Sequence, residues 1–329
     1  MNRKRTIVVG LGPAGAFAVK RLARNNPEQE ILLFDANRDG FYARMRLPEY
    51  IAGTLTQEGL SLGAPDSIAS WGCEPHLGER VLKLLPAERK IVSEKGDYGY
   101  DSLLLATGST AFVPPVPGAE GNPRVHSLRS IEDADAILAA LKHAKRATVI
   151  GGGLLGLEAA HALRTHGVAV EILEAADRLL PRQLEPESSE ELARQLKEQG
   201  YACRVGVSVQ GIEGGSVRLA DGLLPETDLI LFSAGIRSNV SLAKDAGIAC
   251  GRGITVDESM RTSCPDVYAA GDCAEFNGMA PGLWMAAKDQ GEAAADAICG
   301  LPASIAGRTY RPMLKIPGAD VSKLRRTAG

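Results

Sequence analysis

Short, continuous apolar runs alternate along this chain with longer segments in which apolar residues recur every three or four positions. The runs are typical of strands buried on both faces, and they include residues 7–9, residues 103–105 and the stretch DLILF at 228–232. Helical spacing is clearest in SIEDADAILAALKHA, SSEELARQLKEQG and PGLWMAAKDQGEAAADAICG. This alternation predicts an α/β protein with mostly parallel sheets, in which ligands bind at the carboxyl ends of the strands.

Length and charge restrict the possible classes of protein. With 329 residues the chain is long enough for two domains, and 45% of its residues are hydrophobic. The formal net charge is −3, which argues against a basic nucleic-acid surface and against a polybasic membrane patch. The opening MNRKRTIVVG has too short an apolar run for a secretory signal, and no run approaches the length of a membrane span. We therefore expect a cytoplasmic protein.

The six cysteines are scattered, and none forms a CxxC pair. They lie at positions 73, 203, 250, 264, 273 and 299. This spacing favours reduced, mostly buried thiols, and it does not match a zinc-ligand set, so we expect no metal site.

The first glycine motif lies in TIVVGLGPAGAFAVKRLARN, between a strand and a helix. Gly10 permits a tight turn, Gly12 lets the backbone approach a pyrophosphate, and Gly15 lets the helix pack closely on the strand. The helix N-terminus then offers N–H groups to the phosphates, with proline tolerated at its first turn. Asp35 ends the next strand, EILLFD, where a carboxylate can accept hydrogen bonds from a ribose hydroxyl. Strand, glycines, helix, strand and acid in this order make the dinucleotide-binding motif specific.

The same pattern recurs 141 residues later in ATVIGGGLLGLEAAHALRTHGVAVEILE. Its glycines are Gly151, Gly153 and Gly156, and its terminal acid is Glu174. A βαβ unit without a ligand is the alternative reading. Because a carboxylate repels a 2′-phosphate and accepts from a 2′-hydroxyl, Glu174 favours NADH over NADPH, although Arg178 follows closely and argues the other way. Two such motifs in one chain predict two cofactors, one of which reduces the other.

Four stretches, VVGLGPAG, LLLATGS, VIGGGLLGLEAAHAL and VYAAGD, stand in the order found in the pyridine nucleotide-disulfide oxidoreductase family. The resemblance covers about residues 5–300 and is greatest to the branch of rubredoxin reductases, nitrite reductase flavin domains and NADH oxidases. It implies two Rossmann-like three-layer domains, with the FAD domain split around an inserted NAD domain. The implied boundaries are 1–112 and 239–300 for FAD, 113–238 for NAD, and 301–329 for a remnant of the C-terminal interface domain or a tail.

The resemblance also implies which residues bind each cofactor. For FAD they are Gly10, Gly12, Pro13, Ala14, Gly15, Asp35, Arg44, Val81, Ala106, Thr107, Gly108, Asp272 and Trp284. For NAD they are Gly151, Gly153, Leu155, Gly156, Glu158, Glu174 and Gly235. Three of these have a structural alternative: Asp272 as a helix N-cap, Trp284 as a packing residue near a helix start, and Arg44 as a solvated surface side chain.

Glu158 is implied to lie where the nicotinamide meets the flavin, and a helix glutamate with a structural partner is the alternative. The family's usual lysine partner is absent, because no lysine occurs between Lys20 and Lys83. Glu158 is therefore expected either beside an arginine or with an altered titration.

The stretch GFYARMRLPEYIAG, residues 40–53, corresponds to the segment in which disulfide-reducing family members carry a redox cysteine. Alignment on Leu47 and Pro48 puts Met45 in the cysteine position, and a thioether cannot form a thiolate or a mixed disulfide. The nitrite- and rubredoxin-reductase version of the segment instead matches Tyr42, Arg44 and Leu47, which makes Arg44 a candidate partner of the FAD pyrophosphate.

We therefore expect an FAD-dependent NADH:acceptor oxidoreductase in which no side chain acts as nucleophile and the flavin supplies the redox chemistry. The expected acceptor is rubredoxin or another small redox protein. Oxygen, as in an NADH oxidase, is the alternative acceptor, and a flavin-binding redox sensor or subunit without turnover is the alternative class.

Overall fold

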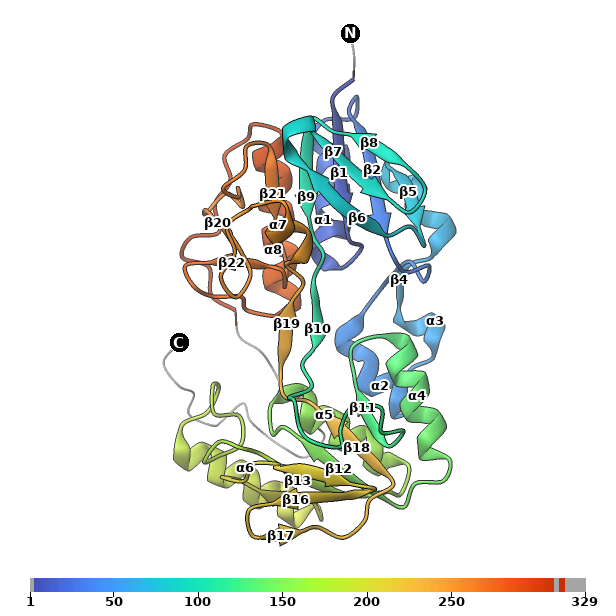
Figure 1. Cartoon of the computed structure of the whole chain (residues 1–329), viewed down its shortest axis with the longest axis vertical. Coiled ribbons are helices and arrows are strands. Elements are labelled where there is room, and N and C mark those ends of the chain that lie inside the picture. The colour runs from blue at the N-terminus through green and yellow to red at the C-terminus, as the bar shows by residue number, and fades with distance from the viewer. Residues whose placement is uncertain (1–2, 311–313, 317–329) are drawn as a thin grey trace. The chain divides into compact units, whose positions relative to one another are not determined.

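The computed structural model describes residues 3–310 and 314–316, and they divide into two compact units. The first unit contains residues 3–43, 61–110 and 236–310, and the second contains residues 44–60, 111–235 and 314–316. Each unit is built around its own parallel sheet, and Figure 1 labels strands of both sheets.

The main sheet of the first unit has five parallel strands, whose order is β21-β9-β1-β2-β5. Their bounds are Val267–Ala269 (β21), Ser102–Leu105 (β9), Arg5–Val9 (β1), Glu30–Asp35 (β2) and Glu74–Leu77 (β5). Apolar residues fill β1, β2 and β9 because these strands are covered on both faces. The register aligns Val9 with Phe34 and with Leu105, and Leu105 with Ala269, so the carboxyl ends of four strands meet at one edge.

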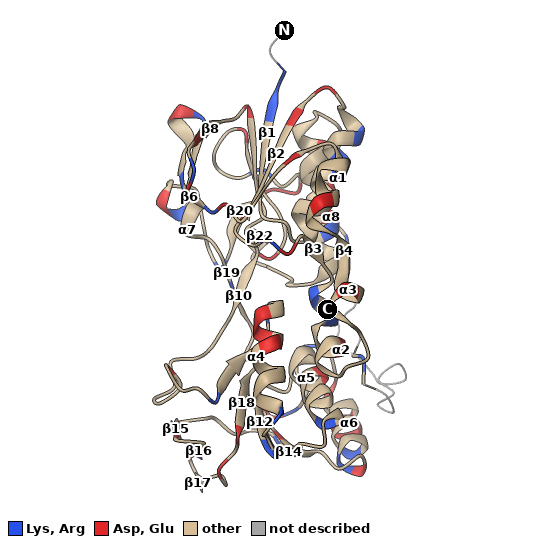
Figure 2. Ribbon diagram, turned by 90° about the vertical axis from the view of Figure 1, so that its right-hand side faces the viewer, with Lys and Arg blue, Asp and Glu red and all other residues tan. Residues whose placement is uncertain are grey.

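Helices α1 (Pro13–Asn25) and α8 (Trp284–Ile298) lie side by side on one face of this sheet, as Figures 1 and 2 show. Their backbones approach closely at a glycine: a Cβ at Gly291 would lie 2.1 Å from the carbonyl oxygen of Ala14. The alanine-rich sequence of α8 therefore serves close helix packing. On the other face lies an antiparallel sheet of β6 (Val81–Leu85), β7 (Lys90–Ser93) and β8 (Asp97–Gly99).

Smaller elements complete the first unit. The paired strands are β3 (Phe41–Tyr42) with β4 (Ser61–Gly63), β10 (Ser109–Ala111) with β19 (Ile236–Ser238), and β20 (Ile254–Val256) with β22 (Ala274–Phe276). The last residue of β10 already belongs to the second unit. The short helices are η2 (Pro65–Trp71), η3 (Pro86–Glu88) and α7 (Ser241–Asp245).

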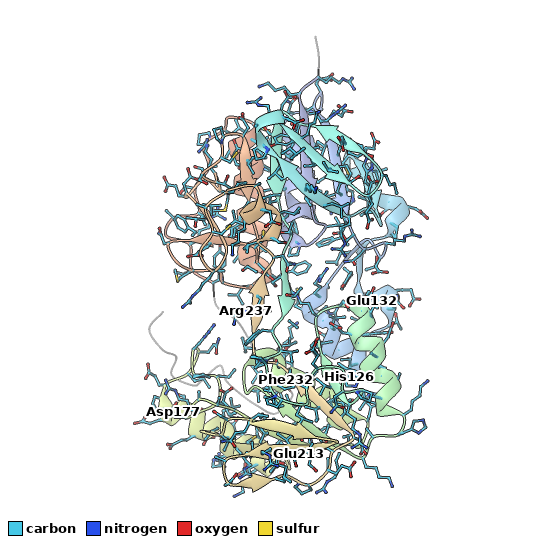
Figure 3. The ribbon with its side chains drawn as sticks, viewed as in Figure 1. His126, Glu132, Asp177, Glu213, Phe232 and Arg237 are labelled. Carbon is cyan, nitrogen blue, oxygen red and sulfur yellow. The ribbon has the colours of Figure 1, made fainter. Side chains whose placement is uncertain are left out.

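The second unit repeats the parallel plan, with the strand order β11-β18-β12-β13-β14. Their bounds are Val125–Ser127 (β11), Leu229–Phe232 (β18), Arg146–Ile150 (β12), Ala169–Leu173 (β13) and Ala202–Arg204 (β14). The helices are α4 (Ile131–Leu141), α5 (Leu154–Thr165) and α6 (Pro186–Glu198), and a small antiparallel sheet contains β15 (Gly211–Glu213), β16 (Ser216–Leu219) and β17 (Gly222–Leu223). Figure 3 labels Phe232 in this sheet, where its side chain is buried in the core, and His126 on the neighbouring strand.

A short segment consisting of η1 (Arg44–Arg46), α2 (Leu47–Ile51) and α3 (Gln57–Leu60) also belongs to the second unit. Helix α2 packs on α4 and α5. The Tyr50 hydroxyl donates to the Asp135 carboxylate at 2.7 Å, and the Nε2 of His166 lies 2.6 Å from the carbonyl oxygen of Ile51. The second unit is therefore assembled from separate stretches of the chain.

The α/β class with parallel sheets is confirmed, and the strands and helices expected from the apolar pattern are present. Helix α4 starts where its sequence predicts, because Ser130 and Asp133 form a reciprocal capping box at its N-terminus. Among the described residues no helix is long and apolar enough to cross a membrane. Division into an FAD domain and an NAD domain stays a prediction.

Candidate functional site

The first glycine turn, residues 10–15, forms what we call the first cradle, at the carboxyl end of β1. Gly10 has φ of 112°, and a Cβ there would lie 2.1 Å from the carbonyl oxygen of Ala106. A Cβ at Gly15 would lie 1.9 Å from the carbonyl oxygen of Gly10. Gly12, in contrast, is the N-cap of α1 and would meet no atom within 4 Å. Two of the glycines are therefore required by the fold, and the third leaves open space before a helix N-terminus, as a phosphate site needs.

Asp35 holds this turn from the end of β2. One carboxylate oxygen accepts from the Leu11 N–H at 2.5 Å, and the other accepts from the Asn37 N–H at 2.7 Å. The acid is therefore already oriented by the backbone beside the first cradle, where a ribose hydroxyl is expected. Pro13 is at the first helical position, as expected, and Ala14 is buried. The expected contacts of both residues with FAD stay predictions.

The next strand end carries Ala106, Thr107 and Gly108, directly beside Gly10. The Thr107 hydroxyl donates to the Asn239 carbonyl at 2.8 Å, and the Asn239 side chain donates back to the Thr107 carbonyl at 2.9 Å. Reciprocal bonds of this kind fix the loop that continues the first cradle.

Asp272 follows β21 at the same edge of the sheet. Its carboxylate accepts from the Ser109 hydroxyl at 2.9 Å, and its carbonyl accepts from the Ser238 hydroxyl at 2.6 Å. The alternative interpretation of Asp272 as a helix N-cap is wrong, because α8 is capped at Leu283 and no helix starts at Asp272. The structure therefore brings Gly10, Ala106 and Asp272 to one edge of the sheet.

Trp284 is the first residue of α8, and its ring stacks on Phe41 with centroids 5.5 Å apart and an interplanar angle of 19°. Phe41 also makes edge contacts with Phe17 and Trp71, and Lys20 lies 3.9 Å above the Trp71 ring. Burial lowers the pKa of this lysine. Trp284 thus has a packing role, and a contact with flavin stays a prediction.

Val81, expected to meet the adenine, starts β6 and is buried.

The second cradle, residues 151–156, repeats the geometry of the first. Gly151 has φ of 124°, with a Cβ position 2.2 Å from the carbonyl oxygen of Ser233. The Cβ position of Gly156 lies 2.0 Å from the carbonyl oxygen of Gly151, while Gly153 caps α5 and would meet nothing within 4 Å. The turn is therefore shaped for a dinucleotide in the same way as the first. Leu155 lies on the exposed first turn of α5, and Gly235 lies in the loop that follows β18.

Glu174 lies immediately after β13 and corresponds to Asp35. Its carboxylate accepts from the Gly152 N–H at 2.6 Å and from the Ala176 N–H at 2.8 Å. Arg178, the basic residue that argues for NADPH, pairs with the exposed Asp177 carboxylate at 2.9 Å and also donates to the Pro181 carbonyl. Asp177 is labelled on the second unit in Figure 3. Two carboxylates in this loop favour a ribose hydroxyl over a phosphate.

Glu158, on the second turn of α5, is a half-buried carboxylate that accepts one hydrogen bond from the residues described by the structure. Its Oε1 accepts from the backbone N–H of Lys315 at 3.0 Å. Burial raises the pKa of Glu158, the Lys315 N–H and ammonium oppose that shift, and Glu49 adds to it. The expected arginine neighbour is therefore replaced by Lys315, and the alternative of an altered titration agrees with the direction of the pKa.

Lys315 was not predicted from the sequence. Its ammonium lies 3.3 Å from Glu49 Oε1, and Arg46 binds the other oxygen of Glu49 at 2.5 Å. The lysine lies 157 positions after Glu158, so only the fold brings the two residues together.

Arg44 is half-buried, and its guanidinium donates to the Arg129 carbonyl at 3.4 Å, so it is not simply a solvated surface residue. Its expected contact with a pyrophosphate stays a prediction. Met45 beside it is 43% exposed.

The thiols have the character of unreactive cysteines. Burial raises the pKa of Cys73 and of Cys203 to about 11, and it also raises that of the fully buried Cys273. No group of three or more His, Cys, Asp or Glu side chains arranged for a metal ion occurs in the described part of the chain.

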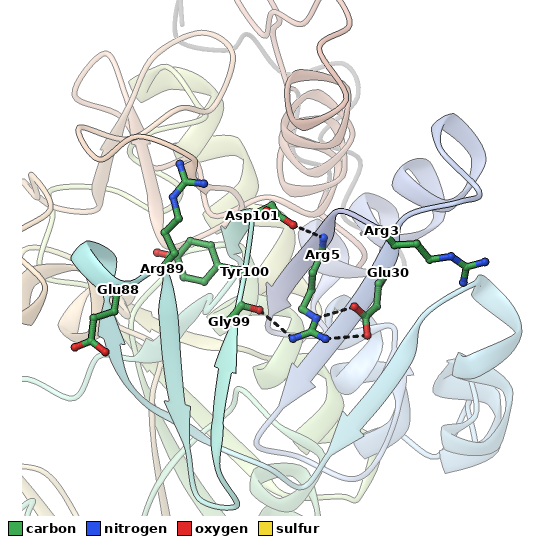
Figure 4. Close-up of a pocket in the computed structure, with 8 residues that line it drawn as sticks. All are labelled: Arg3, Arg5, Glu30, Glu88, Arg89, Gly99, Tyr100 and Asp101. Carbon is green, nitrogen blue, oxygen red and sulfur yellow. Dashed lines mark hydrogen bonds and ion pairs between the residues drawn. The ribbon is translucent and has the colours of Figure 1, made fainter. Parts of the chain in front are cut away.

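A pocket of about 670 Å³ lies at the opposite ends of the strands from the first cradle (Figure 4). Arg5 starts β1 there, and its side chain binds the Glu30 carboxylate at 2.7 Å, while its backbone N–H donates to Asp101. Because these charges are paired with one another, and because ligands of such sheets bind at the carboxyl ends, we assign this pocket no part in the function.

Comparison with known proteins agrees with this geometry. A family model described as pyridine nucleotide-disulphide oxidoreductase matches residues 4–291. The chain is 33% identical to the assimilatory nitrate reductase electron transfer subunit of Bacillus subtilis and 35% identical to the nitrite reductase [NAD(P)H] of the same organism. Each match covers 98% of this chain but only 42% and 41% of the relative, so the chain spans about two fifths of their length.

Among solved structures, NADH:rubredoxin oxidoreductase from Clostridium acetobutylicum is 30% identical, with a TM-score of 0.83 over 96% of this chain and 80% of the other. Two open cradles, each at a helix N-terminus with an oriented acid, fit the two dinucleotide cofactors, FAD and a nicotinamide dinucleotide, that this family uses. The chain therefore belongs to the pyridine nucleotide-disulphide oxidoreductase family, a class of NAD(P)H-dependent flavin enzymes.

Proposed function

We propose that this chain is an FAD-dependent NADH:acceptor oxidoreductase. NADH binds at the second cradle, FAD binds at the first, and the electrons pass from NADH through FAD to a separate acceptor. The observation that carries the proposal is the pair of cradles, each with an open N-cap glycine and a carboxylate already bonded to the turn.

Each part of the chain has a defined task in this proposal. The N-termini of α1 and α5 bind the two pyrophosphates through backbone N–H groups, and Asp35 and Glu174 accept from ribose hydroxyls. Bound flavin supplies the chemistry, accepting a hydride and releasing electrons to a second substrate. The protein contributes positioning and electrostatics, with Glu158 at the nicotinamide end.

NADH is favoured over NADPH because the loop after β13 presents Glu174 and Asp177, and because Arg178 is engaged by Asp177. The 2′-phosphate of NADPH would be repelled by these two carboxylates, and Arg178 is already paired with one of them.

The acceptor is a small redox protein such as rubredoxin. Support comes from the rubredoxin-reducing structural relative and from the relative named as an electron transfer subunit. Met45 in the position of the family's redox cysteine, together with thiols of raised pKa, leaves no thiol relay between flavin and acceptor. Oxygen is the second candidate acceptor, and a flavin subunit without turnover is the candidate from another class.

Anaerobic stopped-flow mixing of the FAD-loaded protein with NADH tests the proposal. We expect the absorbance of oxidised flavin to disappear within seconds of mixing. If the flavin stays oxidised for minutes, the enzyme proposal is wrong and the protein is a flavin-binding subunit without turnover. Subsequent mixing with rubredoxin, ferricyanide or air-saturated buffer ranks the acceptors. Faster reoxidation by oxygen than by rubredoxin would reverse our order.

A further inference from the structure

Lys315 connects two acidic side chains that belong to different helices of the second unit. Its backbone N–H donates to Glu158 on α5, and its ammonium pairs with Glu49 on α2. One residue therefore uses its main chain on one carboxylate and its side chain on the other. The inference drawn from this bridge rests on the proposed function, because it concerns the nicotinamide end of the NADH site.

The charges of Arg46, Glu49, Glu158 and Lys315 sum to zero when all four side chains are ionised. Arg46 and Lys315 carry two positive charges, and Glu49 and Glu158 carry two negative charges when ionised. Arg46 takes one oxygen of Glu49, so the ammonium of Lys315 takes the other and is fixed there. Neighbouring Ile316 is 5% exposed, which anchors the main chain on the C-terminal side of the lysine.

One carboxylate oxygen of Glu158 is hydrogen-bonded within the described part of the chain, and the other is not. Oε1 is bound by the Lys315 N–H, while Oε2 has no hydrogen-bond partner among residues 3–310 and 314–316. Solvent reaches Oε2, so a donor group of a ligand can replace water there. The carboxamide of a nicotinamide carries such a donor in its NH₂ group.

We propose that Lys315 is a positioning residue for NADH: it holds Glu158 by Oε1 and thereby presents Oε2 to the carboxamide NH₂ of the nicotinamide. The ammonium acts indirectly, because its bond to Glu49 fixes the peptide N–H that holds Glu158. In this arrangement Lys315 supplies an ammonium to Glu49 and a peptide N–H to Glu158, whereas no lysine occurs between Lys20 and Lys83.

A purely structural role is the competing explanation, in which Lys315 only fastens its own segment to α2 and α5. The two roles differ in what they do to ligand choice. A fastening residue changes stability and weakens all nicotinamide ligands alike, whereas a residue acting through Glu158 selectively weakens ligands that carry the carboxamide NH₂ group.

The test compares two ligands by isothermal titration calorimetry on the FAD-loaded protein: NAD⁺, and its 3-acetylpyridine analogue, in which a methyl group replaces NH₂. Lys315→Met removes the ammonium but keeps the backbone N–H and the aliphatic stem. We expect the wild type to prefer NAD⁺ and Lys315→Met to lose about three- to tenfold of that preference, with Lys315→Arg restoring most of it.

Two further variants complete the design. Lys90→Met, which removes an ammonium paired with Glu88 at 3.2 Å in the first unit, should leave the preference unchanged. In a Glu158→Ala background, Lys315→Met should have no further effect on the preference, because the residue acts through Glu158.

The possible outcomes distinguish failure of the proposed function from failure of the proposed role of Lys315. If wild-type protein neither binds NAD⁺ nor is reduced by NADH, the proposed function is wrong. If the wild type binds NAD⁺ but Lys315→Met weakens both ligands equally, or weakens neither, Lys315 has no positioning role and the proposed function stands.

Discussion

The two cradles have nearly the same backbone, yet the helices that follow them carry different side chains at the same position. Glu158 lies seven residues after Gly151, and Phe17 lies seven residues after Gly10. Phe17 belongs to an aromatic group around Phe41, whereas Glu158 belongs to a group of charged side chains with Lys315. The glycines thus allow a dinucleotide to bind in each unit. The residue seven positions after the first glycine determines whether the side chains beside that dinucleotide are aromatic or charged.

Packing of the two helices differs in the same way. Helix α1 is pressed against α8 at the Ala14–Gly291 contact, and most of its residues near the first cradle are buried and apolar. Helix α5 packs on the short helix α2, which carries the ionised Glu49. The two glycine turns therefore have the same backbone geometry, and they differ in the elements that pack against the helix after each turn.

The largest effect is expected from adding a methyl group at the glycines that touch backbone. Gly15→Ala and Gly156→Ala each place a Cβ about 2 Å from a carbonyl oxygen, so the turn must move. We expect a loss of about 3 kcal/mol in the free energy of unfolding, measured by urea denaturation, together with loss of bound cofactor.

Gly12→Ala and Gly153→Ala are the matched controls, because their Cβ positions meet no protein atom. These variants should keep near-wild-type stability and still lose affinity, for FAD and for NADH respectively. Equal destabilisation by all four substitutions would contradict the distinction between fold-required and ligand-facing glycines.

A smaller effect is expected when the acid of the second cradle is changed. Glu174→Ala removes the carboxylate that accepts from Gly152 and Ala176 and that would repel a 2′-phosphate. The wild type should prefer NADH over NADPH by at least about tenfold in kcat/KM, which is about 1.4 kcal/mol, and the variant should lose most of that preference. Similar kcat/KM values for both nucleotides in the wild type would refute the NADH assignment.

A pH-dependent effect should distinguish Glu158 from Phe17. Burial raises the pKa of Glu158 above its ordinary value of 4.5, so the folded state holds the proton more tightly than the unfolded state. As pH rises from below 4.5 through the raised pKa, the unfolded state releases its proton first and the fold is destabilised. Glu158→Gln should therefore gain stability over wild type between acid and neutral pH.

Thermal unfolding at pH 4 and pH 7 measures this gain, with the difference between variant and wild type larger at pH 7. Phe17→Leu, at the corresponding position of α1, should change stability by the same amount at both values. A Glu158→Gln difference independent of pH would show that the carboxyl has an ordinary pKa.

The smallest effect is expected from the thiols. Since burial raises the pKa of Cys73 and Cys203 to about 11, they are protonated at neutral pH and react slowly. Treatment with iodoacetamide at pH 7 should leave the rate of flavin reduction by NADH within about twofold of the untreated protein, measured by stopped flow. If the rate of flavin reduction fell as fast as one cysteine was alkylated, that thiol would take part in the mechanism.

The sequence predicts the parts of the molecule that are local. Strand, turn, helix and terminal acid lie within a short stretch in each cradle, so composition and spacing are enough to recognise them. Asp272 shows where this stops: its partner Ser109 lies far away in the chain, and the local alternative of a helix cap was wrong.

Long-range neighbours were not predictable for the same reason. Nothing in the pattern around Lys315 indicates that its N–H meets Glu158, or that α2 packs with α4 and α5. The stacking of Trp284 on Phe41 depends on where α8 crosses the sheet, which is decided by the Gly291–Ala14 contact. These contacts arise from packing between elements, and a single sequence carries no periodicity for them.

The strand orders have a consequence for synthesis on the ribosome. The five strands of the second sheet are all present once residue 232 has been made, whereas the first sheet needs β21 at residues 267–269 and its helix layer needs α8. Until then β9 is an unpaired edge and the alanine face of α1 is uncovered, so the first cradle lacks the strand end that carries Asp272. The unit that begins the chain is therefore completed after the sheet inserted within it, and a nascent chain should acquire its flavin late.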